Sequence, residues 1–391
     1  MLRYLLVLTF LALRTRRAHV HAILRAAHPD AARAMSNPPP EPIVLRAHRS
    51  DAQCASFDAS GVLYTGDADG EVVRWDVERR RVVHRARAHG PTSGVLAMAH
   101  FNFVSRASSR AGDGSGDDDV PTRCTQGRDG SVKYWRRAGD ASDDRGVEIA
   151  SRTIRGGVFG FCRLVSDGDE LIARATCARG SVVVERAETG RAACALPALG
   201  KEDDESDPRA GVAMCISFIR SEHVIVGYED GTIAIWALDF ESGRGEVKWR
   251  RRTHKESALC ADVDALGEGF VTGGADGTLV RYAVDVNVVP LMCEVVRAHG
   301  PYAEVITSSS KQPGVSACAI RGDGKIVASG CWDGKIRVYE YKRKSKGRVL
   351  AVLKYHAATV TDVLFAPDDS YLVSTARDGA VALWPIFPPS E

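Results

Sequence analysis

The chain lacks the short motifs through which many enzymes hold phosphate, dinucleotides or metal ions. It has no P-loop, no Gly-x-Gly-x-x-Gly run leading into a helix and no His-Glu-x-x-His. Its ten cysteines form no Cys-x-x-Cys pair and no Cys/His cluster with zinc spacing. These absences remove the usual sequence signals for a catalytic, cofactor or metal site. We therefore expect a protein that is not an enzyme and has no cofactor.

A large excess of one charge is also missing. The 391 residues carry a formal net charge of +2, of which residues 1–34 contribute +5 and the remainder −3. A slightly acidic body gives no electrostatic footprint for nucleic acid, so we expect no direct nucleic-acid binding. Most cysteines lie in apolar, strand-like stretches, where a free thiol behaves as a small hydrophobic group. This usage indicates a reduced, intracellular protein rather than a disulfide-bonded secreted one.

Long hydrophobic runs are scarce near the N-terminus. Residues 4–13 form an apolar run of ten, which is too short to span a bilayer alone. Arginines follow this run with almost no acidic residue, which resembles a transit peptide more than a secretory signal. Met35 then opens a polar, proline-rich lead. We interpret residues 1–40 as a disordered leader, or as upstream sequence translated by mistake. Organelle targeting and a membrane anchor are the alternatives, and every interpretation places these residues outside the folded domain.

One repeated phrase dominates the rest of the chain. An Asp-Gly pair is followed by an aromatic residue six positions after the Asp, and this occurs six times. The copies are Asp69-Gly70 with Trp75, Asp129-Gly130 with Trp135, Asp230-Gly231 with Trp236, Asp276-Gly277 with Tyr282, Asp333-Gly334 with Tyr339 and Asp378-Gly379 with Trp384. Successive Asp positions differ by 60, 101, 46, 57 and 45 residues. A period of roughly 40 to 50 residues with this content is the signature of a WD40 β-propeller.

A seventh, degenerate copy is expected inside the 101-residue gap, which is two periods wide. Strand-like runs continue there, but Arg179-Gly180 replaces the Asp-Gly pair and Glu185 replaces the aromatic residue. Within the second copy, residues 106–120 are rich in Ser, Gly and Asp and are expected to form a disordered loop, because they cannot bury an apolar face. The prediction is an all-β propeller of seven blades over residues 41–391.

The two ends of the repeat region predict how the ring closes. The sequence ends seven residues after Trp384, which leaves no room for an outer strand in the last blade. Ile43, Val44 and Leu45 form a strand-like run before the first blade and have no other partner. We predict that this run supplies the missing outer strand, because open terminal blades would expose unpaired strand edges.

Histidine, a hydroxyl residue and aspartate recur together with the repeat, and the hydroxyl residue always lies four positions before the Asp. The sets are His48/Thr65/Asp69, His89/Thr125/Asp129, His254/Thr272/Asp276, His299/Ser329/Asp333 and His356/Ser374/Asp378. A catalytic triad occurs once, whereas these sets follow the period of the fold. As in WD40 repeats, we interpret them as buried hydrogen-bond networks that include Trp75, Trp135 and Trp384. Val226 at the hydroxyl position, and tyrosine in place of tryptophan in blades five and six, predict weaker networks there.

Three charged stretches carry further hypotheses. Residues 201–207 are interpreted as a solvated acidic loop. Residues 342–348 fit either a nuclear import cluster or a polar hairpin between strands. Residues 248–252, Lys-Trp-Arg-Arg-Arg, are interpreted as an edge or turn in which an exposed Trp249 would form a contact site.

Several stretches within residues 38–387 are more specific than the general repeat. They include Thr125-Gln-Gly-Arg-Asp129, Gly160-Phe-Cys-Arg163 and Trp332-Asp-Gly-Lys-Ile-Arg-Val338. They resemble one WD40 family, the G-protein β-subunit-like protein 1 family, also called ASTRA-associated protein 1 in fungi. The resemblance implies a non-enzymatic, monomeric propeller within a multi-subunit complex of nucleus and cytoplasm. It also implies links to chromatin regulation and to the maturation of phosphatidylinositol-3-kinase-related kinases with co-chaperones. Phe161 and Arg163, in the degenerate blade, are our candidate partner contacts.

Other function classes fit the sequence less well. A substrate receptor of a cullin-type ubiquitin ligase is the alternative, although Trp75-Asp76 is followed by Val77-Glu78 and not by the x-Arg that such receptors carry. A true G-protein β subunit would need sustained heptads in an N-terminal helix, and residues 1–40 have none. A propeller enzyme would need a polar cluster that occurs only once.

Overall fold

The computed structural model describes residues 40–101, 122–138, 147–154, 160–176, 178, 180–200, 210–285, 288–296, 313–341 and 348–386. The chain divides into two units, Met1–Pro40 and Glu41–Glu391. All of the first unit except Pro40 lies outside the described residues, as do residues 106–120, 201–207 and 342–347, so the hypotheses for those stretches stay predictions. No helix in the described ranges is long and apolar enough to cross a bilayer.

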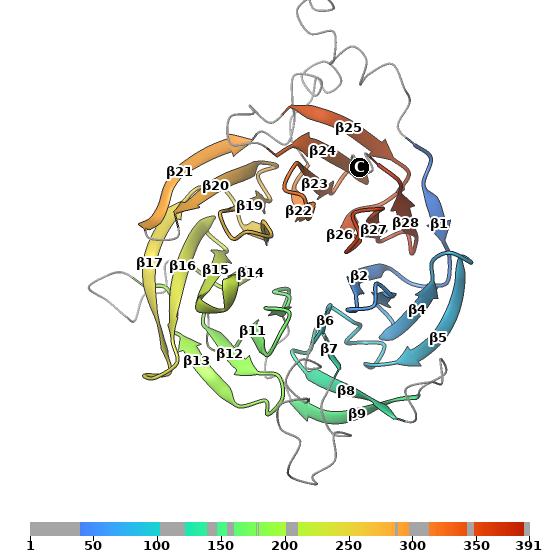
Figure 1. Cartoon of the computed structure of the whole chain (residues 1–391), viewed down its shortest axis with the longest axis horizontal. Helices are drawn as coiled ribbons and strands as arrows, with labels where there is room; N and C mark the ends of the chain where they lie inside the picture. Colours follow the sequence, from blue (N-terminus) through green and yellow to red (C-terminus); the bar gives the residue numbers. More distant parts are fainter. Residues whose placement is uncertain are drawn as a thin grey trace, which may run out of the picture. The chain divides into compact units, whose positions relative to one another are not determined.

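The second unit is a ring of small antiparallel sheets whose strands step outward from the centre (Figure 1). The innermost strands are β2 (Ala52–Phe57), β6 (Ala97–His100), β10 (Val165–Ser166), β14 (Ala213–Ile219), β18 (Ala258–Val263), β22 (Val315–Ile320) and β26 (Val360–Phe365). The second strands are β3 (Leu63–Asp67), β7 (Arg123–Gln126), β11 (Leu171–Ala175), β15 (His223–Tyr228), β19 (Gly269–Gly274), β23 (Ile326–Cys331) and β27 (Leu372–Ala376).

The third strands are β4 (Glu71–Asp76), β8 (Val132–Ala138), β12 (Val182–Arg186), β16 (Thr232–Asp239), β20 (Leu279–Asp285), β24 (Lys335–Glu340) and β28 (Val381–Trp384). The outer strands are β5 (Arg81–Arg87), β9 (Val147–Ile154), β13 (Ala192–Leu196), β17 (Arg244–Arg252), β21 (Val288–Val296), β25 (Val349–Lys354) and β1 (Ile43–Leu45). A single-turn 3₁₀ helix at Arg220–Glu222 joins β14 to β15.

These strands make seven blades, as predicted. They form five sheets of four strands and one of eight. The eight-stranded sheet consists of blades three and four, whose outer strands β13 and β17 share one parallel pair, Ala195 with Arg244. The degenerate third repeat therefore keeps its four strands even though it has lost the Asp-Gly-aromatic phrase.

The glycine of the repeated phrase is required by two separate constraints. Gly70 follows β3 in the turn to β4 and has a φ of +86°, a conformation that residues with a side chain rarely adopt. A Cβ on Gly70 would also lie 2.1 Å from the carbonyl oxygen of His89, in the segment leading to the next blade. Gly231 meets the carbonyl of His254 in the same way, at 2.3 Å. Each such turn thus fits closely against the segment that begins the following blade.

The N-terminal strand closes the ring, as predicted. β1 pairs antiparallel with β28, with Ile43 opposite Leu383, Val44 opposite Ala382 and Leu45 opposite Val381. Leu45 is buried at the junction between blades seven and one. The last blade therefore takes its outer strand from the opposite end of the sequence (Figure 1).

The hydrophobic core is divided among the junctions between blades. Seven clusters of buried apolar side chains occur among the described residues, and each joins two neighbouring blades. At the closing junction, for example, Leu63 and Trp75 of blade one pack with Val373 and Leu383 of blade seven. No cluster belongs to one blade alone, so each blade needs both neighbours to bury its two faces.

Deleting residues 41–46 should yield aggregated or insoluble protein. The deletion removes β1, leaves β28 with an unpaired edge and opens the junction that Leu45 fills. Size-exclusion chromatography with light scattering and a thermal melt would measure the effect. Arg46→Ala is the matched control, because Arg46 is exposed, and it should stay soluble and monomeric. A monomeric deletion variant with an unchanged melting curve would contradict this account of closure.

Candidate interaction site

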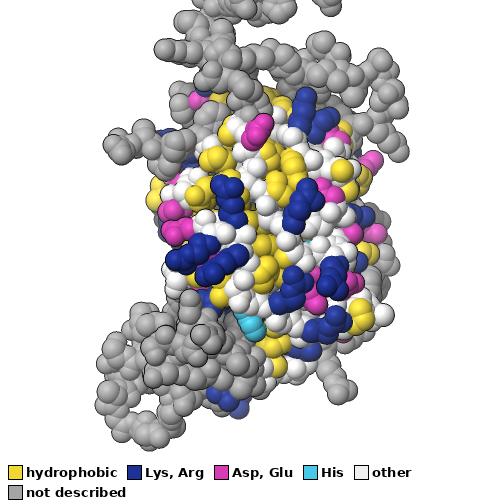
Figure 2. Space-filling model, turned by 90° about the vertical axis from the view of Figure 1, so that its right-hand side faces the viewer, with side chains coloured by type: hydrophobic (Ala, Val, Ile, Leu, Met, Phe, Trp, Pro, Cys, Tyr) yellow, Lys and Arg dark blue, Asp and Glu magenta, His cyan; other side chains and the backbone are white. Residues whose placement is uncertain are grey.

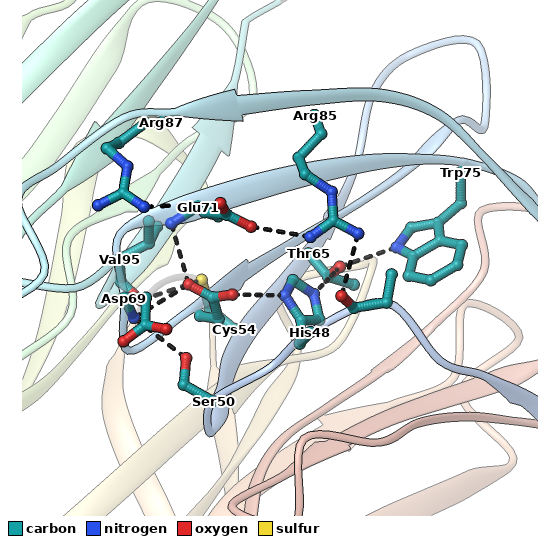
Figure 3. Close-up of polar contacts among 12 residues, drawn as sticks. His48, Ser50, Cys54, Thr65, Asp69, Glu71, Trp75, Arg85, Arg87 and Val95 are labelled. Carbon is teal, nitrogen blue, oxygen red and sulfur yellow. Dashed lines mark hydrogen bonds and ion pairs between the residues drawn. The ribbon is translucent and has the colours of Figure 1, made fainter.

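The network of blade one joins a tryptophan, a threonine, a histidine and an aspartate (Figure 3). The indole N–H of Trp75 donates to Thr65 Oγ1 at 2.8 Å, and His48 Nε2 lies 2.6 Å from the same oxygen. His48 Nδ1 donates to Asp67 Oδ2 at 2.9 Å. Because the carboxylate can only accept, Nδ1 of His48 carries a proton, which places Nε2 next to the threonine hydroxyl.

The aspartate in this network is Asp67 and not Asp69, which corrects the prediction. In blades two and five, the position two residues before the Asp is Gly127 or Gly274, and a Cβ there would point at the Nδ1 of the network histidine, at 2.8 or 2.5 Å. Asp67 occupies the equivalent position, so its own carboxylate reaches His48. The backbone N–H of Asp69 donates to the Asp67 carboxylate at 3.0 Å. The presence of two aspartates, Asp67 and Asp69, in one turn was the sequence signal that either of them could contact His48.

Blade seven contains the four predicted members together. Trp384 Nε1 donates to Ser374 Oγ at 2.9 Å, and His356 Nε2 lies 2.8 Å from that oxygen. His356 Nδ1 lies 3.2 Å from Asp378 Oδ2. The Asp378 carboxylate also accepts a hydrogen bond from the backbone N–H of Ala357 at 3.0 Å. Asp378 therefore orients the imidazole ring of His356 and also holds the backbone of the next residue.

Blade two reaches its aspartate through an additional serine. Trp135 Nε1 donates to Thr125 Oγ1 at 2.9 Å, and His89 Nε2 lies 2.9 Å from the same oxygen. Ser131 Oγ lies 3.4 Å from His89 Nδ1 and donates to Asp129 Oδ1 at 2.6 Å. Burial, together with the smaller effect of the neighbouring Lys133, lowers the pKa of His89 to about 4. His89 is therefore neutral near pH 7.

Blade five forms the network with tyrosine in the aromatic position. His254 Nε2 lies 2.7 Å from Thr272 Oγ1, and the Tyr282 hydroxyl lies 3.3 Å from that oxygen. His254 Nδ1 contacts both Asp276 Oδ1, at 3.3 Å, and Thr278 Oγ1, at 2.9 Å. Although burial opposes it, hydrogen bonds from His254, Thr278 and two backbone amides hold the pKa of Asp276 far below its usual range.

Blades three and four lack the network for different reasons. In blade three, Glu185 occupies the aromatic position, and Arg174 lies at the strand register of the hydroxyl residue, opposite Val183. Arg174 and Glu185 form a bidentate salt bridge with N–O distances of 2.6 and 3.1 Å. The sequence pattern did not identify Arg174, because its blade has a longer turn. In blade four, Val226 leaves the buried Trp236 without the hydroxyl acceptor found in blades one, two and seven.

Blade six contains a charged pair beside its predicted network. Asp333 pairs with Arg337 on the next strand, with N–O distances of 2.8 and 3.1 Å. Ser329 lies directly opposite Arg337 and is buried. His299, the predicted histidine of this blade, lies outside the described residues, so its contact with Ser329 stays a prediction.

The hydroxyl groups of these networks are inaccessible to a substrate. Thr65, Thr125, Thr272, Ser329 and Ser374 are each 0% exposed. Within the part of the chain that the structure describes, no cluster of three or more His, Cys, Asp or Glu side chains is arranged to hold a metal ion. The geometry suits networks that hold strands in register, because the hydroxyl groups of blades one, two, five and seven each contact the histidine that begins the same blade.

Arg163 lies at the centre of the ring, where its side chain is 31% exposed, and its role as a partner contact stays a prediction. It precedes β10 in blade three, yet its guanidinium donates to the carbonyl oxygens of Gln53 in β2 at 2.6 Å and Thr361 in β26 at 2.8 Å. Its other terminal nitrogen pairs with Asp362 Oδ2 at 2.8 Å. One side chain thus joins the innermost strands of blades one and seven to the segment that begins blade three.

Phe161 and Trp249, the other two candidate contacts, differ in exposure. Phe161 is 66% exposed, two residues before Arg163. Trp249 is half-buried, not exposed as predicted, and its ring meets Tyr282 edge-on at a centroid distance of 5.9 Å. Trp249 therefore packs at the junction between blades four and five. Of the three residues, only Phe161 presents most of its side chain to solvent.

Comparisons with known proteins agree with this architecture. The WD40 family (WD domain, G-beta repeat) matches residues 303–340 and 347–385. The chain is 26% identical over 371 residues to the mouse guanine nucleotide-binding protein subunit beta-like protein 1, covering 91% of this chain and 99% of the relative. It is 24% identical over 382 residues to ASTRA-associated protein 1 of Schizosaccharomyces japonicus, covering 88% and 98%.

A second fungal relative and a solved structure extend the comparison. ASTRA-associated protein 1 of Aspergillus flavus is 27% identical over 392 residues and covers 84% of each chain. The β-propeller domain of Cps50 (Swd1) from Myceliophteria thermophila has a TM-score of 0.66 at 15% identity, and the match covers 88% of this chain and 100% of that domain. At this identity, the structural likeness shows the propeller fold alone.

Arg163→Met should lower the free energy of unfolding by about 2–4 kcal/mol, because Asp362 would lose its cation inside the protein. Urea denaturation would measure the change. Phe161→Ala is the matched control two residues away and should leave stability nearly unaltered, since the Phe161 side chain is mostly exposed. Unaltered stability of Arg163→Met would show that this residue does not link the blades.

The buried, neutral state of His89 should make stability depend on pH. Its pKa is about 4 in the folded protein and about 6.5 when unfolded. Between these values the unfolded chain binds more protons, so stability falls as pH drops, by at most about 1.4 kcal/mol per pH unit for this one group. His89→Gln should be less stable at pH 7 yet show a shallower slope over this window. Urea titrations at several pH values would test it, and parallel curves for the two proteins would refute it.

Proposed function

We propose that the chain is a non-enzymatic scaffold of an ASTRA-type complex. It is a WD40-repeat protein, and over most of its length it is related, at low identity, to G-protein β-subunit-like protein 1 and to fungal ASTRA-associated protein 1. The observation that carries the proposal is the extent of the match, which covers 91% of this chain and 99% of the mouse relative. An alignment of this extent involves all seven blades and not only the general repeat.

The specific role that follows is assembly of large kinases. We propose that the propeller works with co-chaperones in maturing phosphatidylinositol-3-kinase-related kinases and contributes to chromatin regulation, in both nucleus and cytoplasm. A closed ring suits such a role because it presents loops on two faces while its strand edges stay short. WD40 propellers are generally non-catalytic, and the burial of the network hydroxyls is consistent with that rule.

One face of the ring is the better candidate for partner contact. Within each blade, the strands alternate in direction, so the Asp-Gly turns and the segments that begin the innermost strands lie on the same face. We call it the Asp-Gly face. Phe161, Val212 and Trp332 all lie in such turns or segments and are 66%, 37% and 47% exposed. Exposed aromatic side chains of this kind are typical anchors of protein interfaces.

The matched control for this face lies on the other one. Leu266 is 67% exposed, almost the same as Phe161. It lies between β18 and β19, where an innermost strand ends, and therefore on the face opposite to the Asp-Gly face. Replacing Phe161 or Leu266 by alanine removes a similar exposed apolar side chain, so a difference between the two variants reports on the face and not on general hydrophobicity.

Affinity purification of the tagged full chain, followed by mass spectrometry, tests the proposal. Co-chaperone and kinase-related subunits are expected in the eluate. Phe161→Ala should reduce their recovery at least about threefold without changing the melting temperature, as expected for a moderate interface contact, whereas Leu266→Ala should not. Recovery of cullin adaptors would instead support a ubiquitin-ligase substrate receptor. Equal loss of recovery and stability in Phe161→Ala would mean that Phe161 serves the fold.

A further inference from the structure

The outer strand of blade one presents a continuous basic edge. β5 is the last strand in its sheet, whose order is β2-β3-β4-β5, so one of its backbone edges has no partner strand among the described residues. Its sequence is Arg-Val-Val-His-Arg-Ala-Arg, and Arg79 and Arg80 immediately precede it. Figure 2 shows this side of the ring, where Lys and Arg side chains are spread widely with acidic side chains between and around them.

Two acidic residues beneath this edge, Glu71 and Asp76, each form ion pairs with two arginines. Glu71 pairs with Arg85 at 2.8 Å and with Arg87 at 3.6 Å (Figure 3). Its carboxylate is 23% exposed, against 36% and 56% for the two arginines. One carboxylate between two guanidinium groups leaves a net charge of +1 and holds both groups in place. Arg85 also donates to the carbonyl oxygen of Ala47 at 3.0 Å, whereas the side chain of Arg87 is the more exposed of the two.

The same arrangement repeats at the other end of the strand. Asp76 pairs with Arg79 at 3.1 Å and with Arg81 at 3.4 Å, and the arginines are 69% and 64% exposed against 16% for the aspartate. Arg80 lies between them and makes no ion pair with any described residue, while Glu78 supplies one exposed acid. The edge therefore keeps a net positive charge along its whole length.

Apolar side chains lie between the two charged ends. Val82 and Val83 are 37% and 40% exposed. They stand at a β-bulge, where Arg74 pairs with His84 but Trp75 pairs with Val82, so Val83 has no opposite residue on β4. An unpaired strand edge that combines exposed β-branched residues with cations offers both the backbone and the side-chain contacts needed to add another strand.

The other arginine-rich outer strand does not offer the same surface. On β17, Arg250 donates to the carbonyl of Gly200 at 2.9 Å, and Arg252 donates to that of Asp230 at 2.8 Å. The first residue of β17, Arg244, already pairs with Ala195 of β13. Arg250 and Arg252 are thus held by backbone carbonyls, as Arg85 of β5 also is, by that of Ala47 at 3.0 Å. The side chains of Arg79, Arg81 and Arg87 instead pair only with shared carboxylates among the described residues and are mostly exposed.

We propose that β5 binds an acidic, extended segment of a partner protein, which adds as a fifth strand to blade one. Arg85 and Arg87 lie two residues apart on the same side of the strand, opposite Val73 and Glu71. A partner strand with acidic residues at alternate positions would place its carboxylates against both. This inference gives the proposed scaffold role one surface and one partner chemistry, and it rests on that role.

The test uses purified full-length protein and a defined probe. The probe is a fluorescein-labelled peptide of about eight residues that alternates Glu and Val, a length typical of one strand. Fluorescence anisotropy should show saturable binding that weakens when salt is raised from about 0.05 M to about 0.5 M, because exposed charges are screened. The same peptide with its two central valines replaced by proline should not bind, since proline cannot continue the ladder of backbone hydrogen bonds.

Two matched variants locate the site. Arg81→Gln/Arg87→Gln removes two exposed cations from β5 and should weaken peptide binding at least about tenfold. Arg244→Gln/Arg251→Gln removes the same charge from β17 and should leave binding unaltered. Thermal melts of both would show whether each variant is folded. If the β5 variant does not fold, protection of the β5 backbone amides from hydrogen exchange on adding peptide to the native protein decides the question.

The proposal would be overturned if both double variants weakened peptide binding equally, or if the peptide did not protect the β5 backbone amides from exchange. It would also be overturned if the proline peptide bound as tightly as the Glu-Val peptide, which would indicate charge attraction alone. Tighter binding of a DNA duplex through the same arginines would reassign the edge to nucleic acid. Failure in this assay leaves co-purification with co-chaperones untouched, so it can be told apart from failure of the scaffold role.

Discussion

The antiparallel pairing of β1 with β28 is the contact on which the rest of the ring depends. Each hydrophobic cluster of the described residues lies between two blades, and the cluster at the closing junction includes Leu45 from β1 itself. A blade that loses one neighbour exposes half of its apolar surface and an unpaired strand edge. Since the contacts pass from blade to blade around the circle, one open junction weakens the burial of the two blades beside it. Closure is therefore a property of the whole ring and not of one strand.

Arg163 supplies a second link that does not follow the circle. It crosses from the start of blade three to the innermost strands of blades one and seven, and so connects blades that are not neighbours. Its charge is matched by Asp362, which also accepts the backbone N–H of Ala55 at 3.1 Å. The degenerate blade, which has lost its own histidine network, thus contributes a polar contact at the centre of the ring. In the same short segment, the Phe161 side chain is exposed to solvent. Two residues apart, one side chain therefore links blades and the other lies on the surface.

The polar networks show how one task can be met by different groups. In blades one, two, five and seven, a histidine and a hydroxyl residue hold adjacent strands together. Blade three replaces the hydroxyl and aromatic residues by Arg174 and Glu185, and blade six pairs Asp333 with Arg337. An ion pair needs two complementary charges, so the two replacements in blade three form a matched pair. In blade four, Val226 provides no hydroxyl acceptor for Trp236, which packs within the apolar cluster between blades three and four.

The repeat by itself determined the all-β class, the number of blades and the closing strand, because period, turn glycine and strand alternation are local features. Gly70, for instance, is already required by its own φ in the turn. The sequence could not determine that Asp67 replaces Asp69 beside His48, that Arg174 takes the hydroxyl position, or that Trp249 packs against Tyr282. Nor could it show that Arg163 contacts the innermost strands of blades one and seven, since its partner Thr361 lies 198 residues away. Which side chains meet is decided by strand register and by the packing of one blade on the next, and only the folded ring brings those strands together.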